Sequence, residues 1–181
     1  MNKIQHIIVV AMTISMMGCP ARSLFPLFTE KDLVFDQALV GTWDGTEDGE
    51  TYAFQRSGEK GYAVVLRDKS GDTRNYNVQL GRLGTFLFTD TSPSKGGGDH
   101  HFISAHLISR IALEGDTLRM SLLESDWLRD MIDAKKLSIA HVRRSGEIIL
   151  TATTEELQSL VLRFAEDDKA FPNPAVLVRM K

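Results

Sequence analysis

Short runs of β-branched, aromatic and alternating residues, separated by turn-forming residues, fill most of the chain and set its fold class. The first runs cover residues 42–46, 51–56, 62–68 and 73–80, with clusters of Gly, Asp, Ser and Lys between them. Strands of four to eight residues at a spacing of about 8–12 residues are typical of all-β barrels and sandwiches. This half of the chain therefore predicts an antiparallel β-meander.

The rest of the chain continues the meander and adds two short helices. Residues 85–89 and 101–113 have the pattern of strands, and the second run alternates to give an apolar face. Ser125 is the expected N-cap of a first helix, a hairpin is expected over 137–151, and a last strand over 175–180. We expect a mainly β fold: an antiparallel meander that closes into a barrel, or folds into a sandwich, with two short helices.

The second helix has clear local signals. Thr153 and Glu156 have the spacing of a capping box, which places the start of a helix near residue 154. Apolar residues at steps of three and four share one side of this helix: Leu157, Leu160, Val161 and Phe164. A short helix of this kind is marginal alone in water. We expect its apolar side to pack on the barrel; the alternative is that it docks another protein at a membrane.

The N-terminus has the pattern of a secretory signal peptide. A short region with a positive residue, Lys3, precedes an apolar run over residues 4–17. The run is shorter than the roughly 20 residues of a membrane-spanning helix. A buried helix of the folded domain is the alternative, but no capping residue or polar face organises the segment. We therefore assign residues 1–18 to a signal peptide.

The only cysteine of the chain follows this segment. Met16-Met17-Gly18-Cys19 resembles the lipobox of bacterial lipoproteins, although Met17 stands where a small residue is usual. The resemblance implies that the Cys19 thiol is joined to diacylglycerol, that cleavage precedes Cys19, and that the new amino terminus is acylated. An ordinary secretory signal with an incidental cysteine is the alternative, which we disfavour because no second cysteine exists to form a disulfide.

The lipobox resemblance also implies a location. Two or more acyl chains anchor a protein stably to a bilayer. Pro20 follows the cysteine, where aspartate is the usual signal for retention in the inner membrane. We expect a bacterial envelope protein, lipid-anchored to the outer membrane and facing the periplasm. Residues 19–35 are then a lipidated N-terminus and tether, and residues 36–181 a single β-rich domain.

The charge of the chain argues against some partners. It has 21 basic and 24 acidic residues and a formal net charge of −3, and removal of Lys3 with the signal makes it slightly more acidic. A mildly acidic surface does not favour nucleic acid, which selects basic patches, or strong adhesion to anionic lipid apart from the anchor.

One internal motif resembles a second family. Gly41-Thr42-Trp43 is similar to the glycine-x-tryptophan that opens the first strand of lipocalins and related calycin barrels. The resemblance implies that Trp43 plugs one end of a barrel and that a late basic side chain crosses it. Arg143, Arg144 and Arg179 are the candidates. A lipocalin has its helix after the last barrel strand, whereas here a helix interrupts the strands.

Other motifs have simpler explanations. Residues 44–50 imitate the start of an EF-hand loop, but Gln55 occupies the position of the bidentate glutamate, so an acidic turn is expected. Asp99, His100 and His101 follow a glycine run and suggest a metal loop, which we disfavour because the glycines leave it poorly preorganised. His106 is too far along the strand from His100 to share an ion. We expect no metal site and no cofactor.

No catalytic motif is evident, so we do not expect an enzyme. A Gly-x-Ser-x-Gly elbow is absent, and His141 is expected to be an ordinary strand residue. The favoured function is a non-catalytic module that binds an apolar ligand or a protein partner at the membrane. The alternatives are a structural or assembly accessory without a ligand and, least favoured, an enzyme of unfamiliar type. The sequence identifies no ligand-binding residue.

Replacement of Cys19 by alanine tests the anchor. We expect Cys19→Ala to remove the acylated thiol and to leave an uncleaved or unlipidated protein, because no other cysteine can take its place. Metabolic labelling with a fatty-acid analogue measures this. Equal label in the variant and the parent would contradict the assignment.

Overall fold

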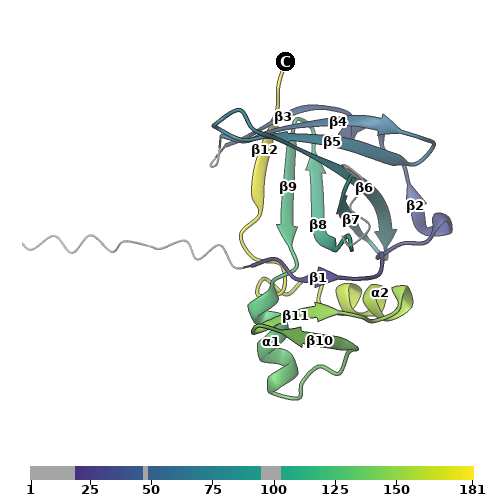
Figure 1. Ribbon diagram of the computed structural model, residues 1–181. Coiled ribbons are helices and arrows are strands. Elements are labelled where there is room, and N and C mark those ends of the chain that lie inside the picture. The colour runs from purple at the N-terminus through teal and green to yellow at the C-terminus, as the bar shows by residue number, and fades with distance from the viewer. Residues whose placement is uncertain (1–18, 47–48, 95–102) are drawn as a thin grey trace, which may run out of the picture.

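Antiparallel strands dominate the computed structural model, which describes residues 19–46, 49–94 and 103–181 (Figure 1). The strands are β1 (Arg22–Ser23), β2 (Leu33–Val34), β3 (Gly41–Gly45), β4 (Thr51–Ser57), β5 (Gly61–Arg67), β6 (Thr73–Leu83), β7 (Phe86–Pro93), β8 (His106–Glu114), β9 (Thr117–Leu122), β10 (His141–Arg144), β11 (Glu147–Leu150) and β12 (Ala175–Arg179). The α-helices are α1 (Ser125–Asp133) and α2 (Thr154–Arg163).

In the described part of the chain, eight strands close into a barrel. Of the two arrangements that the sequence predicts, a barrel and a sandwich, the structure has the barrel. Strands β3 to β9 each pair with the next in antiparallel register, and β12 completes the ring by pairing with both β9 and β3. At the closing seam Arg179 lies opposite Trp43. The meander therefore runs unbroken around the barrel, and α1, β10, β11 and α2 form an insertion before its last strand.

Local turn chemistry sets the hairpins. In the turn between β10 and β11, Ser145 and Gly146 both have positive φ, 52° and 84°, as a two-residue type I′ hairpin turn requires. Gly115, with φ of 59°, makes the tight turn from β8 to β9. The turn at Ser145 and Gly146 lies within the hairpin that the sequence predicts over residues 137–151.

Buried side chains fill the barrel interior around Trp43 and Leu80. Its core consists of Leu39, Trp43, Phe54, Tyr62, Val64, Val78, Leu80, Ile111, Leu118 and Leu177. Trp43 and Leu80 have no accessible surface, and Tyr62, Leu118 and Leu177 are each 1% exposed. A side chain with so little accessible surface borders no space that could hold a water molecule, so this part of the lumen is a packed core.

Trp43 and Arg179 form the closed end of the barrel that the calycin resemblance implies. The Arg179 guanidinium lies 4.2 Å from the centre of the Trp43 ring, and the indole N–H donates to the carbonyl of Leu39 at 3.0 Å. Gly41 makes room for the arginine, because its φ is 143° and a Cβ there would lie 2.5 Å from Arg179 Nη1. Of the three candidate arginines, Arg179 is the one over Trp43.

A second core lies at the other end of the barrel, between it and the inserted elements (Figure 1). Residues from α1, α2 and β11 pack there with Phe88 and Ile108 of the barrel. Leu157, Leu160 and Val161 of α2 are buried in this core, so the predicted packing of the helix is confirmed. The side chain of Glu124, rather than the expected Ser125, caps α1 by accepting from the Asp126 amide.

The segment expected to be a tether is built into the domain. Strand β1 pairs with β8 on one side and with β11 on the other, and β2 pairs with β6. Leu27 and Phe28 are buried, and the Phe28 ring occupies the space that a Cβ on Gly81 would fill. Ala21, Leu27 and Phe28 belong to the second core, and Phe35 packs against the barrel core.

Two predicted strands are shorter than expected. β8 begins at His106 instead of residue 101, and β10 begins at His141 instead of residue 137. Residues 137–140 lie outside the strands, and the Leu137 amide donates to the Met131 carbonyl of α1 at 3.1 Å.

Replacement of Trp43 by alanine tests the packed barrel. We expect a loss of about 3–5 kcal/mol in the free energy of unfolding, as for large aromatic residues in cores, because Trp43 is fully buried and covered by Arg179. Denaturant titration measures it. Trp43→Phe is the milder comparison, and an unchanged midpoint for Trp43→Ala would contradict the assignment.

Candidate functional site

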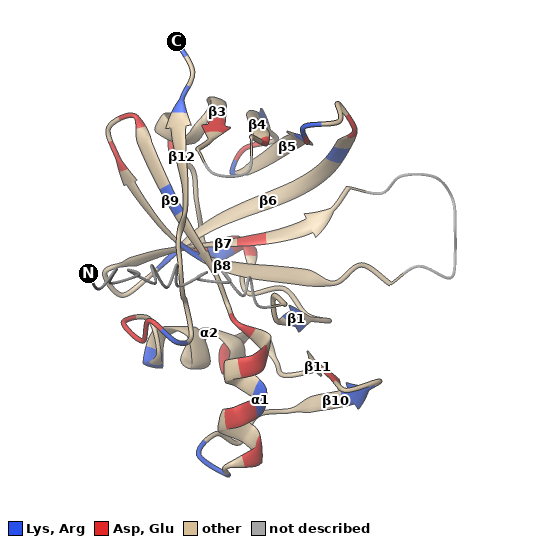
Figure 2. Cartoon of the chain, turned by 90° about the vertical axis from the view of Figure 1, so that its left-hand side faces the viewer, with Lys and Arg blue, Asp and Glu red and all other residues tan. Residues whose placement is uncertain are grey.

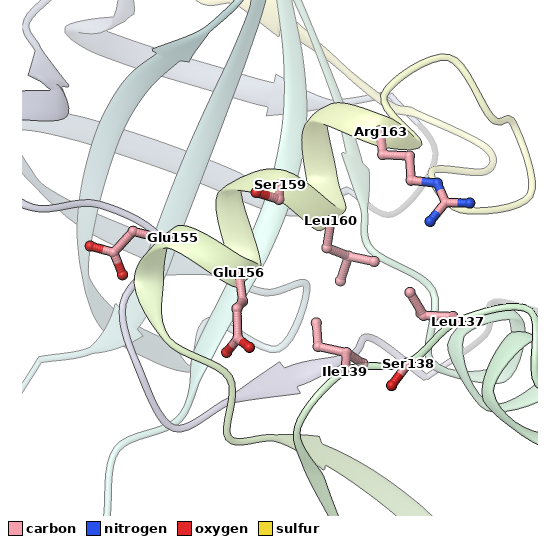
Figure 3. Close-up of a pocket in the computed structure, with 8 residues that line it drawn as sticks. All are labelled: Leu137, Ser138, Ile139, Glu155, Glu156, Ser159, Leu160 and Arg163. Carbon is pink, nitrogen blue, oxygen red and sulfur yellow. The ribbon is translucent and has the colours of Figure 1, made fainter.

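A pocket of about 300 Å³ opens between α2 and residues 137–139 (Figure 3). Its lining residues are Leu137, Ser138, Ile139, Glu155, Glu156, Ser159, Leu160 and Arg163. The volume is at the lower end of the range for ligand pockets. It suits one or two side chains of a partner better than a large cofactor.

Helix α2 supplies one wall, and its sequence fixes its start. The Thr153 hydroxyl accepts from the Glu156 amide at 3.3 Å and the Glu156 carboxylate accepts from the Thr153 amide at 2.9 Å, which is the predicted capping box. Leu160 points from this helix toward Ile139 (Figure 3). The buried side of α2 thus also forms the apolar floor of the pocket.

The N-terminal segment holds α2 in place. Thr154 Oγ1 donates to the Pro26 carbonyl at 2.8 Å, and Gln158 Nε2 donates to the Leu27 carbonyl at 2.9 Å. Gln158 also donates to Asp32 at 3.1 Å. Hydrogen bonds from Thr29 to the carboxylate lower the pKa of Asp32. These contacts attach α2 to the N-terminal segment.

The opposite wall follows α1. Lys135, with φ of 56°, reverses the chain after the helix, and the Thr151 amide donates to the Ala140 carbonyl at 2.9 Å. Leu137 and Ile139 pack on the second core. Residues 137–139 and α2 therefore pack on the same core.

Charge is unevenly distributed around the apolar floor. Glu155 and Glu156 lie at the N-terminal end of α2, where the helix dipole favours negative charge, and Arg163 lies at the other end of the pocket (Figure 3). Glu156 is engaged in the capping box. The Arg163 guanidinium lies 4.9 Å from the Phe164 ring centre, and no carboxylate of the described residues forms an ion pair with it. An apolar group that carries an anionic group fits this arrangement.

The structure places the predicted site residues apart. Cys19 is exposed. Arg143 and Arg144 lie on β10, where Arg143 pairs with Asp133 of α1, far in the fold from the Trp43 end. His141 is the first residue of β10, as expected of a strand residue. Its Nδ1 atom lies 2.9 Å from the Ile139 carbonyl oxygen. Asp99, His100 and His101 lie outside the described residues, as does Asp48.

One polar cluster was missed by the sequence analysis. Asp90 is 2% exposed, accepts from the Leu27 amide at 2.7 Å, and lies 2.7 Å from His106 Nδ1. The cluster attaches the N-terminal segment to β7 and β8. No sequence signal links residues so far apart, because the barrel register alone brings them together. Within the described part of the chain, no three potential ligands come together to hold a metal ion.

Comparison with protein-family models, curated proteins and solved structures finds no match to this chain. Among the described residues, neither α-helix is long and apolar enough to cross a bilayer.

Paired alanine variants on α2 test whether the apolar side of this helix is part of the second core. We expect Leu160→Ala to cost about 2–5 kcal/mol of stability, as for buried leucines, since Leu160 is 4% exposed. Leu162→Ala is the matched control, because Leu162 is 44% exposed and should change little. Thermal unfolding measures both, and equal midpoints would show that α2 is not part of the core.

Proposed function

We propose that this chain is a lipid-anchored protein of the bacterial envelope whose domain is a non-catalytic module that binds a protein partner. The observation that carries the proposal is the pocket between α2 and residues 137–139 beside a barrel whose core is packed. The lipobox-like sequence at Cys19 supplies the anchor. The outer membrane remains the expected location, because no aspartate follows Cys19.

The form of the pocket favours a polypeptide over an apolar small molecule. The lumen positions around Trp43 and Leu80 are filled, so they leave no room for an apolar ligand there, whereas the pocket beside α2 is open to the surface. Leu137, Ile139 and Leu160 offer an apolar floor for a side chain of the partner, and Arg163 offers a cation to a nearby carboxylate. An extended segment with an apolar residue next to an acidic residue has this chemistry.

The packed barrel also favours a second candidate, a structural or assembly accessory of the envelope. In that case the domain binds no ligand in the pocket, and its role depends only on its position at the membrane. The two candidates differ in whether changes confined to the pocket affect any association.

Photocrosslinking in the producing cell tests the pocket. A photoreactive amino acid in place of Ser159 should give a discrete adduct with a partner, because Ser159 lines the pocket. Arg163→Glu should abolish that adduct by reversing the charge that meets the partner. Arg119→Glu on β9, an exposed position of the barrel, is the matched control and should leave the adduct intact.

The proposal fails if no adduct forms at position 159, or if Arg163→Glu and Arg119→Glu weaken it equally. The first outcome favours the accessory role, since the pocket then contacts no partner. Unfolding curves of both arginine variants must match the parent, which the exposed or half-exposed positions allow.

A further inference from the structure

The chain immediately after Cys19 is fixed to the folded domain. The Cys19 carbonyl accepts from the amide of Ser125, the first residue of α1, at 3.0 Å. Pro20 forms a bridge with Glu124, and the Ala21 amide donates to the Leu123 carbonyl at 2.8 Å. No residue is left between the cysteine and the domain to serve as a flexible linker.

The following residues are held still more firmly. Arg22 and Ser23 form β1, which is paired on both edges, with β8 and with β11. Ala21 is 3% and Ser23 1% exposed. Releasing a linker from this segment would break two strand pairings and open the second core, which has a large free-energy cost.

We infer that the anchored protein lies directly on the bilayer, with the first turn of α1 and the end of β9 against the lipid headgroups. The inference rests on the proposed lipidation of Cys19. An acylated backbone nitrogen and a thioether at Cys19 place that residue at the membrane interface. The hydrogen bond from Ser125 then brings the start of α1 to the same level.

The charges at this surface indicate which lipids it fits. Glu124, Asp126 and Asp130 lie in or just before α1, and Arg129 pairs with Asp126 at 2.7 Å. Figure 2 shows the acidic residues along α1. The turn is therefore net negative, which repels anionic lipid over about a Debye length. It suits zwitterionic headgroups, whose outer group is an ammonium.

Tryptophan fluorescence on vesicles tests the contact. The chain from Cys19 onward, which carries every described residue, is coupled through Cys19 to a maleimide phospholipid in phosphatidylcholine vesicles. Trp127 lies in the first turn of α1, two residues after Ser125 and so about 3 Å further along the helix axis. A lipid with a nitroxide on its headgroup should quench the emission of Trp127.

Two variants make the measurement specific. Trp127→Phe retains an aromatic ring against Phe164 and leaves Trp43 as the only tryptophan. Quenching should be lost in this variant, because Trp43 lies at the far end of the barrel. About ten Gly and Ser residues inserted between Cys19 and Pro20 span about 17 Å and should also remove the quenching, with the domain unchanged.

Equal quenching with and without the inserted linker would overturn the inference, as would strong quenching of Trp43 in the Trp127→Phe protein. The linker comparison keeps both tryptophans and does not depend on the folding of Trp127→Phe. Chemical coupling supplies the lipid in these experiments. A failure here is thus separate from a failure of lipidation in the cell, which the fatty-acid label on Cys19 reports.

Discussion

The contact of Arg179 with Trp43 is the constraint on which the barrel depends. It joins the first and last barrel strands, which are separated by most of the domain, and the guanidinium also donates to the Val40 carbonyl at 2.9 Å. An arginine stacked on a buried indole contributes through cation–π attraction and through apolar contact. Gly41 is needed because any side chain at that position would displace the arginine. The Gly-x-Trp motif is therefore explained by packing at the seam.

The second constraint is the position of β1 between the barrel and the inserted layer. Its pairing with β8 continues the barrel sheet, and its parallel pairing with β11 extends that sheet to β10. The buried Asp90 carboxylate adds a fixed attachment at Leu27. Because β1 pairs with one strand of the barrel and one strand of the inserted layer, we expect the barrel and the inserted layer to unfold together. The same arrangement fixes the chain directly after Cys19 to the domain.

Buried side chains fill the barrel around Trp43 and Leu80, and the pocket described above lies outside this core. Eight-stranded barrels have interiors that side chains can fill or that can hold one small ligand. Here Trp43, Leu80 and their neighbours occupy the interior. The pocket beside α2 instead combines an apolar floor with an arginine that has no carboxylate partner among the described residues.

The sequence by itself determined the features that depend on neighbouring residues. The Ser145-Gly146 turn and the capping box of Thr153 and Glu156 are local, and the strand rhythm follows from the alternation of side chains along each strand. Only the tertiary structure decided that Arg179, and not Arg143 or Arg144, covers Trp43. It also decided that the segment after Cys19 is a strand, and that residues 137–139 meet α2 in a pocket. These features depend on register and packing between distant residues, which no local pattern encodes.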